Sequence, residues 1–241
     1  MKIYILKNNW QNFVNSNCYR NLVLTDLPTS DINIKSIYRK EHEVMKKEKP
    51  MANLIFRIAT ILMRIRGLFR DKKGEVLLTR AKRGDVILDY GCGIGFNTIP
   101  AAEIVGEEGM VYALDIHPLA IKSVEKKIRE KGLRNVKTIL SDLNTGLPNE
   151  SVDIVLLYNV LPMVKNRPAL IKELYRVLRP GGILSVKSGL IVNLYSGEKM
   201  RTEDLEKLMI DNGPLKLERK IGKFHMFRKI KDDDSTSYNG R

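Results

Sequence analysis

The chain has 241 residues, of which 43% are hydrophobic and 29% charged, and its formal net charge is +14. This length suits one α/β domain with a large core and an extension. The two cysteines, Cys18 and Cys92, are too few for a disulfide framework, so we expect a reducing, cytoplasmic compartment. Residues 1–10 lack the apolar segment of a signal peptide, and no stretch of about 18 residues is free of charge, so we expect no membrane-spanning helix.

Positive charge is concentrated toward the N-terminus. Residues 1–75 contain 15 Lys and Arg against 7 Asp and Glu, a net of +8, which leaves +6 for the rest of the chain. This bias indicates contact with a polyanion or an anionic membrane surface; the alternative is a basic surface that only confers solubility. Residues 1–38 show no regular apolar period and predict a loosely ordered arm, and residues 39–50 predict a mixed-charge helix or linker.

Residues 51–70 predict an amphipathic helix with a basic polar side. Its apolar side chains recur every three or four residues, at Leu54, Ile58, Ile61, Leu62, Ile65, Leu68 and Phe69. Two interpretations stay open. The helix either packs on the following domain as a cap, or lies in a membrane interface with its arginines on lipid phosphates, namely Arg57, Arg64, Arg66 and Arg70. The two interpretations are compatible if the cap also admits a lipophilic substrate.

From Gly84 onward, strand patterns alternate with helix patterns, which predicts a parallel sheet covered by helices. Strands are expected near residues 85–90, 110–115, 136–140, 152–158 and 182–188, and helices near 96–105, 118–131 and 167–178. Thr202–Asn212 predicts a further helix with Thr202 as its N-cap. Leu215–Ile221 and Phe224–Ile230 predict a closing hairpin, and 232–241 a disordered tail.

Three glycines, at positions 91, 93 and 95, follow the first predicted strand. Glycines let the chain turn sharply and bring bare backbone against a ligand. Asp115 ends the second strand, twenty residues after Gly95, where an acid can bind ribose hydroxyls. This combination predicts a site for a nucleoside cofactor.

The spacing favours S-adenosylmethionine over a dinucleotide. The dinucleotide pattern requires Gly-x-Gly-x-x-Gly, but here the third glycine comes one residue early and Phe96 takes its place. Asp89, two residues before the first glycine, would repel a pyrophosphate and suits a cationic amino-acid group.

Residues 89–95, Asp-Tyr-Gly-Cys-Gly-Ile-Gly, resemble motif I of class I S-adenosylmethionine-dependent methyltransferases, near the type 11 and ubiquinone/menaquinone branch. Four more segments resemble motifs of this family in the same order: 111–118, 140–143, 147–155 and 173–182. The resemblance implies a Rossmann-like, doubly wound seven-stranded α/β sheet with strand order 3-2-1-4-5-7-6 and strand seven antiparallel. The expected divisions are an N-terminal extension over 1–74, a methyltransferase domain over 75–231 and the tail over 232–241.

The resemblance also assigns roles around S-adenosylmethionine. The glycine loop brings its backbone to the methionine portion, and Asp89 orients that loop or the ammonium group. Asp115 accepts hydrogen bonds from both ribose hydroxyls, Ile116 packs on the adenine, and Asp142 accepts from the adenine amino group. The implied cofactor-binding residues are Asp89, Gly91, Cys92, Gly93, Gly95, Asp115, Ile116, Asp142, Leu143 and Asn159.

The acceptor side departs from the family pattern. Pro162 stands where related sequences often carry His, and none of the three histidines, His42, His117 and His225, is an obvious base. Tyr158 and Asn159 are the remaining catalytic candidates, with a structural role for Tyr158 as the alternative. Methyl transfer from a sulfonium depends mainly on alignment and on excluding water. No Cys/His cluster indicates a metal site.

We therefore expect methyl transfer to a small, lipophilic acceptor such as a quinone-like or lipid precursor. The apolar 51–70 helix supports this, as does the lack of both an Asn-Pro-Pro-Tyr clamp for flipped bases and a thiolate-rich site. Two alternatives stay open: an RNA methyltransferase that uses the basic surface, and a non-catalytic cofactor-binding protein, to which Pro162 points. The expected location is cytoplasmic, with peripheral contact with an anionic membrane as an option.

Overall fold

The computed structural model describes residues 50–67, 71–187 and 201–230. The predicted arm at 1–38, the mixed-charge segment up to residue 49 and the predicted tail at 232–241 lie outside this part of the chain. None of the helices in the described part is long and apolar enough to cross a membrane.

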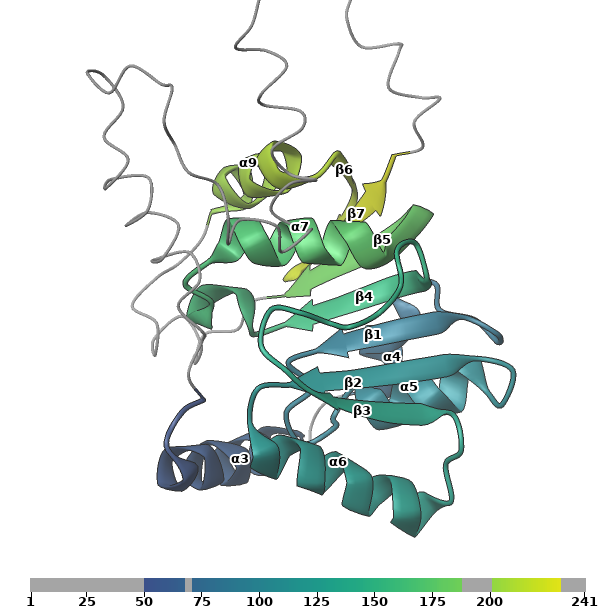
Figure 1. Ribbon diagram of the computed structural model, residues 1–241, viewed down its shortest axis with the longest axis vertical. Helices are drawn as coiled ribbons and strands as arrows, with labels where there is room; N and C mark the ends of the chain where they lie inside the picture. The colour runs from purple at the N-terminus through teal and green to yellow at the C-terminus, as the bar shows by residue number, and fades with distance from the viewer. Residues whose placement is uncertain (1–49, 68–70, 188–200, 231–241) are drawn as a thin grey trace, which may run out of the picture. The chain divides into compact units, whose positions relative to one another are not determined.

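Seven strands form one sheet in the order β3-β2-β1-β4-β5-β7-β6 (Figure 1). The first five strands pair in parallel, and β7 is antiparallel to both β5 and β6. The expected strand order and the antiparallel β7 are therefore confirmed. The strands are β1 Val86–Tyr90, β2 Met110–Asp115, β3 Val136–Leu140, β4 Val152–Tyr158, β5 Leu178–Lys187, β6 Leu215–Ile221 and β7 Phe224–Lys229.

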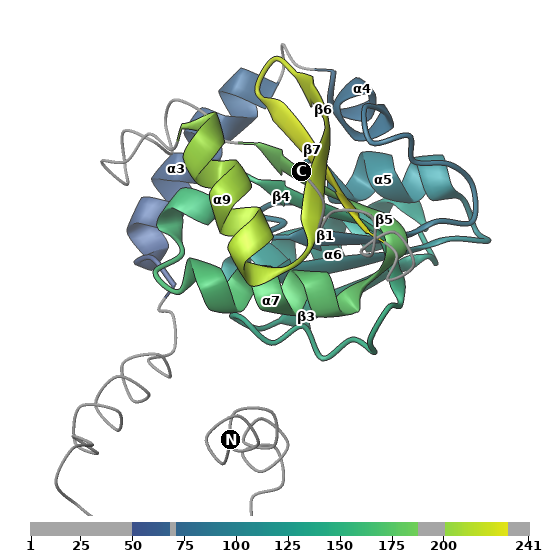
Figure 2. The same cartoon turned by 90° about the horizontal axis from the view of Figure 1, so that it is seen from above.

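Helices cover both faces of the sheet (Figures 1 and 2). The helices of the described part are α3 Asn53–Gly67, α4 Lys72–Leu77, α5 Thr98–Val105, α6 Pro118–Lys131, α7 Arg167–Val177 and α9 Thr202–Asn212, with a 3₁₀ turn, η2, at Leu161–Met163, and α3 lies beyond α6, away from the strands. Side chains alternate across each strand, so Leu88 packs with α7 and α9 while Ile87 packs with α4 and α5. The fully buried β4 pattern follows from this two-sided cover.

Most predicted boundaries agree with the structure, and helix signals explain why. Helix α6 begins at Pro118, is capped by His117 and ends before Gly132 in the left-handed conformation. The prediction of Thr202 as an N-cap is wrong, because Arg201 is the capping residue and Thr202 is the first helical residue. Strand β5 begins earlier than predicted, since Leu178 pairs with Val152 ahead of a register irregularity.

The predicted 51–70 helix forms as α3, Asn53–Gly67, and three side chains of its apolar stripe are exposed. Leu54, Ile58 and Ile61 are 69%, 52% and 57% exposed. The contact with the domain comes from another side of the helix, where Phe56 stacks on His117 with ring centroids 3.9 Å apart. The short helix α4, which the sequence analysis did not predict, spans the expected 74/75 domain boundary and buries Val76.

Candidate functional site

The candidate site lies at the carboxyl ends of β1, β2 and β4. In the strand order 3-2-1-4-5, the connections reverse direction between β1 and β4, and ligands of open α/β sheets bind at such a switch point. The loop at 91–97 leaves β1 at this position and leads into α5. Every residue predicted to bind the cofactor lies in this loop, in the last two residues of β1 or β2, or within three residues after β2, β3 or β4.

The loop's glycines have positive φ angles of 71°, 55° and 81° at Gly91, Gly93 and Gly95. Gly91 also allows close packing, because an added Cβ would lie 2.2 Å from Cγ2 of Val160. At Gly93 an added Cβ would meet no heavy atom within 4 Å, so there is room for a ligand against bare backbone. Gly91 thus permits close packing against Val160, whereas Gly93 leaves space for a ligand.

Asp115 joins the loop to the end of β2. Its Oδ2 accepts a hydrogen bond from the Gly93 N–H at 2.8 Å, and its Oδ1 accepts from the His117 N–H at 2.8 Å. Each carboxylate oxygen retains acceptor capacity for a ligand hydroxyl. Burial raises the pKa of Asp115, while these backbone N–H groups oppose the rise. The carboxylate is therefore held in a fixed orientation with its outer lone pairs available.

Asp89 is almost completely buried and interacts with the start of α5. Thr98 Oγ1 donates a hydrogen bond to Asp89 Oδ2 at 2.6 Å. Burial is the main reason that the pKa of Asp89 is raised to about 6, and the nearby Asp115 charge adds to the rise. Asp89 consequently carries a proton more readily than a surface carboxyl does.

Cys92, Ile116 and Leu143 contribute in different ways. The Cys92 side chain is buried and packs with Ala113 and residues of α6. Burial, together with Asp89 and Asp115, raises the pKa of the Cys92 thiol, which keeps it protonated. Ile116 and Leu143 are half-buried, as a surface that packs on an adenine requires.

Asp142 follows β3 and is half-buried. Its backbone carbonyl accepts a hydrogen bond from the Tyr90 hydroxyl at 2.5 Å, which joins the segment after β3 to the end of β1. Sequence reasoning missed this role of Tyr90. The signal was available, since a tyrosine that ends a buried strand needs a partner for its hydroxyl.

Asn159 has an unusual backbone and an unpaired side-chain oxygen. Its φ is 62°, in the left-handed region, and its N–H donates to the Lys187 carbonyl at 2.6 Å. Its Oδ1 is buried without a hydrogen-bond partner. Such conformations outside glycine concentrate at functional sites, and an unpaired buried acceptor is ready for a ligand donor.

Tyr158, the other catalytic candidate, points into the interior. Its hydroxyl lies 3.0 Å from Ser185 Oγ, and its ring meets Phe224 edge-on at 5.4 Å. Burial raises its pKa far above the ordinary tyrosine value. These contacts are typical of a structural residue and do not suit a general base near neutral pH.

Unpaired buried atoms gather at the carboxyl edge of the sheet. Asn97 Oδ1 and His117 Nε2 join Asn159 Oδ1 among the five buried side-chain polar atoms that lack a hydrogen-bond partner in the described part of the chain. All three follow β1, β2 or β4. Because a buried polar atom without a partner is energetically unfavourable, this grouping supports a polar ligand at this edge.

Two further contacts fix the site, and the sequence analysis missed both. Lys127 of α6 donates to the Ile94 carbonyl at 2.6 Å, which anchors the glycine loop. Lys187, at the carboxyl end of β5, pairs with Glu75 of α4 at 2.7 Å and is almost completely buried. The sequence does show a lysine at the end of an apolar strand. Its partner lies 112 residues earlier in the chain, so only the fold identifies it.

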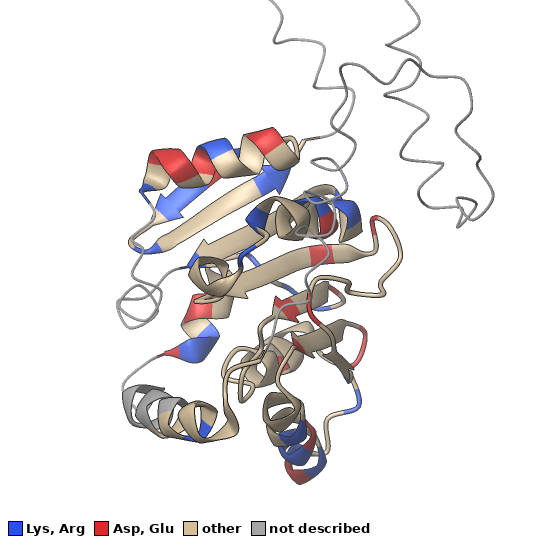
Figure 3. Cartoon of the chain, turned by 60° about the vertical axis from the view of Figure 1, so that its left-hand side comes forward, with Lys and Arg blue, Asp and Glu red and all other residues tan. Residues whose placement is uncertain are grey.

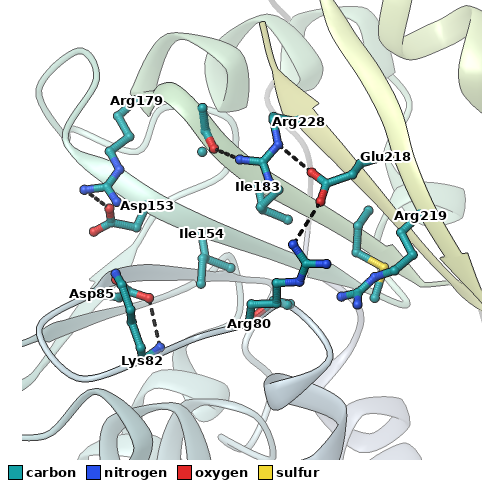
Figure 4. Close-up of a pocket in the computed structure, with 14 residues that line it drawn as sticks. Arg80, Lys82, Asp85, Asp153, Ile154, Arg179, Ile183, Glu218, Arg219 and Arg228 are labelled. Carbon is teal, nitrogen blue, oxygen red and sulfur yellow. Dashed lines mark hydrogen bonds and ion pairs between the residues drawn. The ribbon is translucent and has the colours of Figure 1, made fainter.

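The opposite edge of the sheet holds a cavity of about 140 Å³ that involves none of these residues (Figure 4). Its carboxylates are paired with cations: Lys82 with Asp85 at 2.5 Å, Arg228 with Glu218 at 2.5 Å, and Arg179 with Asp153. The Arg228–Glu218 pair joins β7 to β6, and the Arg179–Asp153 pair joins β5 to β4. Within the described residues, no group of three or more His, Cys, Asp or Glu could hold a metal ion.

Comparison with known proteins agrees with this geometry. A family model described as a methyltransferase domain matches residues 81–223. The chain is similar to the demethylmenaquinone methyltransferase of Geobacillus stearothermophilus, with 39% identity over 113 residues that cover 46% of this chain and 48% of the relative. It is also similar to aklanonic acid methyltransferase of Streptomyces sp. (strain C5), with 43% identity over 74 residues that cover 30% and 34% of the two chains. The matches thus span half or less of these relatives' lengths.

Among solved structures, a SAM-dependent methyltransferase from Aquifex aeolicus matches with a TM-score of 0.56. The match has 23% sequence identity and covers 66% of this chain and 87% of that chain. This likeness establishes the shared fold.

Proposed function

Since the chain belongs to the class I S-adenosylmethionine-dependent methyltransferase family, we propose that it transfers a methyl group from S-adenosylmethionine to a small, lipophilic acceptor. One observation carries the donor half of this proposal. Asp115 holds the Gly93 N–H through one carboxylate oxygen and the His117 N–H through the other, beside a loop with room for a ligand at Gly93. An acid in this position suits a ribose diol.

When bound, S-adenosylmethionine supplies an electrophilic methyl group on a sulfonium, and its leaving group is neutral. The protein's task is then to bind, orient and exclude water. Asp115 binds the ribose hydroxyls, and the backbone of 91–95 lies against the methionine portion. Asp89, at the base of the loop, and Asn159 Oδ1, an unpaired acceptor, suit a cationic amino group. Asp142, beside Leu143, accepts from the adenine amino group.

The acceptor class is inferred from two independent indications. The two relatives described above are named for demethylmenaquinone and aklanonic acid, which favours a quinone-like acceptor. In addition, Leu140 ends β3 and Met163 ends the η2 turn that follows β4, both at the same edge of the sheet as the loop. Their side chains are 57% and 39% exposed. Apolar side chains that are exposed at the edge of a polar site suit an apolar substrate. Asn159, unlike the interior Tyr158, is available to orient such an acceptor.

The first test is cofactor binding by calorimetry. Asp115→Ala removes the ribose acceptor and leaves the Gly93 and His117 N–H groups unpaired, so affinity for S-adenosylmethionine should fall at least about 100-fold, or ~2.7 kcal/mol. Asp204→Ala, which removes an exposed acid on α9, is the control and should bind normally. Equal affinities of the two variants would refute the site assignment.

The second test identifies the acceptor. Protein and label-carrying S-adenosylmethionine are incubated with fractionated cell extract, and label should enter the lipid fraction. Label in RNA would instead support the alternative that the charge of +14 motivates, and RNA binding would then weaken steeply with salt. Cofactor binding without any labelled product would support the non-catalytic alternative.

A further inference from the structure

Helix α3 exposes an unusual amount of apolar surface. Of the nine large hydrophobic residues exposed in the described part of the chain, four lie on this helix: Leu54, Ile55, Ile58 and Ile61, with exposed fractions of 69%, 48%, 52% and 57%. The other five are spread over the rest of the fold. Exposed apolar residues that occur singly need no explanation, whereas a contiguous group marks an interaction surface.

The four side chains share one side of the helix. With about 100° per residue, Leu54, Ile58 and Ile61 fall within an arc of roughly 60°, and Ile55 extends it. Phe56 projects from another side and stacks on His117 at 3.9 Å, which sets the rotation of the helix. The apolar arc is therefore directed away from the domain by a specific contact.

The charge of α3 identifies the partner's chemistry. The helix contains no acidic residue, and the exposed Arg57 borders the apolar arc. In Figure 3 the described part of α3 is tan and blue without red, whereas α6 and α9 carry both signs. Its sequence also contains Arg64 and Arg66. Aliphatic residues beside arginine match the acyl boundary and phosphates of a bilayer, whereas nucleic acid offers nothing to a row of leucine and isoleucine.

We infer that α3 docks the protein on an anionic membrane surface, with Leu54, Ile55, Ile58 and Ile61 among the acyl chains and Arg57 on lipid phosphate. His117, under Phe56, lies two residues after Asp115, so the docked helix adjoins the donor site. A lipophilic acceptor could then pass from the bilayer to the acceptor side without crossing water. This delivery role rests on the proposed function, but the membrane binding does not.

The test is co-sedimentation of the full chain with vesicles of phosphatidylcholine, with and without phosphatidylglycerol. Binding should require the anionic lipid. The double substitution Leu54→Ser with Ile58→Ser should lower the partition coefficient at least about tenfold, because it removes two side chains from the acyl region. The matched control is Leu77→Ser with Ile210→Ser, whose exposed fractions of 49% and 64% are similar but which lie on α4 and α9. It should bind as the unchanged protein does.

Equal loss in both double variants, or no binding to anionic vesicles, would overturn the inference. Binding that high salt abolishes and that Leu54→Ser with Ile58→Ser leaves intact would also overturn it, because charge alone would then suffice. Circular dichroism and S-adenosylmethionine affinity verify that each variant is folded. Methyl transfer to a water-soluble quinol is measured separately. If that activity is present while vesicle binding is absent, the docking inference fails and the proposed function stands.

Discussion

At the residue scale, Asp89 combines burial with charge. It is surrounded by protein, its one described side-chain donor is Thr98 Oγ1, and Asp115 adds a second negative charge nearby. A surface carboxyl ionises near pH 4, whereas burial raises the pKa of Asp89 to about 6. A position that is electrostatically unfavourable for stability yet suits a cationic ligand is expected at a binding site.

The pKa of Asp89 predicts how stability depends on pH. Between about pH 4 and 6 the folded state binds a proton that the unfolded state has lost, so the free energy of unfolding falls as the pH rises, by up to roughly 3 kcal/mol. Asp89→Asn keeps an acceptor for Thr98 and removes the ionisation, so the variant should be more stable than the unchanged protein at pH 7.5 but not at pH 4.

Urea unfolding at both pH values measures this, and Asp211→Asn, at an exposed acid of α9, is the control. An unchanged pH dependence in Asp89→Asn would show that another group is responsible. The same variant should bind S-adenosylmethionine more weakly, since a neutral amide attracts an ammonium group less than a carboxylate does.

At the scale of elements, the loop from β1 to α5 is held from several sides. The Gly91 and Cys92 N–H groups both donate to the Leu114 carbonyl, at 2.8 and 2.9 Å, and Gly93 donates to Asp115. Lys127 anchors the loop from α6. These contacts fix the backbone before a ligand binds, so little ordering entropy is lost on binding.

Alanine at two glycines should separate packing from ligand access. Gly91→Ala places a Cβ 2.2 Å from Val160 Cγ2 at a φ of 71°, so it should destabilise the fold by about 2–4 kcal/mol. In Gly93→Ala the added Cβ meets no heavy atom within 4 Å, so the free energy of unfolding should fall by only about 1 kcal/mol. The variant should nevertheless bind S-adenosylmethionine at least about tenfold more weakly.

Thermal unfolding and calorimetry on both variants provide the measurements. Val160→Ala in the Gly91→Ala background should recover part of the stability, because it removes the clashing methyl. Tight binding by Gly93→Ala would contradict the placement of the cofactor against this part of the loop.

At the scale of the whole molecule, one buried ion pair joins distant parts of the chain. Lys187 on β5 and Glu75 on α4 have side-chain exposures of only 2% and 13%, and Lys187 also lies 4.6 Å from the Phe224 ring. Burial would raise the pKa of Glu75, but Lys187 and Lys72 lower it below its usual value. The pair connects the N-terminal part of the domain to the end of the sheet beside Asn159.

Glu75→Gln should destabilise the protein by about 3 kcal/mol, because it leaves the Lys187 ammonium buried without its carboxylate. Denaturant unfolding measures the loss, and Lys187→Met in the same chain should restore much of it. Glu130→Gln, which removes a surface pair with Lys126 at 3.6 Å, is the control and should change stability by less than about 0.5 kcal/mol. Similar losses in the two single variants would argue against a structural role for the buried pair.

Local signals were enough to predict most elements and the donor side of the candidate site. The boundaries of α6 follow from Pro118 and Gly132, and the apolar residues that dominate β4 predict a buried strand. The glycine spacing, Asp89 and Asp115 could be recognised as parts of one site because they lie close together in the sequence. The strand order came from the motif resemblance. Local signals are weaker where two adjacent residues could each begin a helix. The sequence favoured Thr202 as the N-cap of α9, but Arg201 occupies that position.

The sequence by itself determined the α/β architecture and the expected cofactor loop, because each rests on short-range periodicity and spacing, and the motif resemblance indicated the family. Only the tertiary structure decided that Tyr158 is interior, that Asn159 has an unpaired oxygen, that Glu75 meets Lys187, and that Leu54, Ile58 and Ile61 of α3 are exposed. The physical reason is that burial and pairing depend on residues far apart in the chain. An amphipathic pattern defines two sides of a helix, but the Phe56–His117 contact determines which side meets the domain.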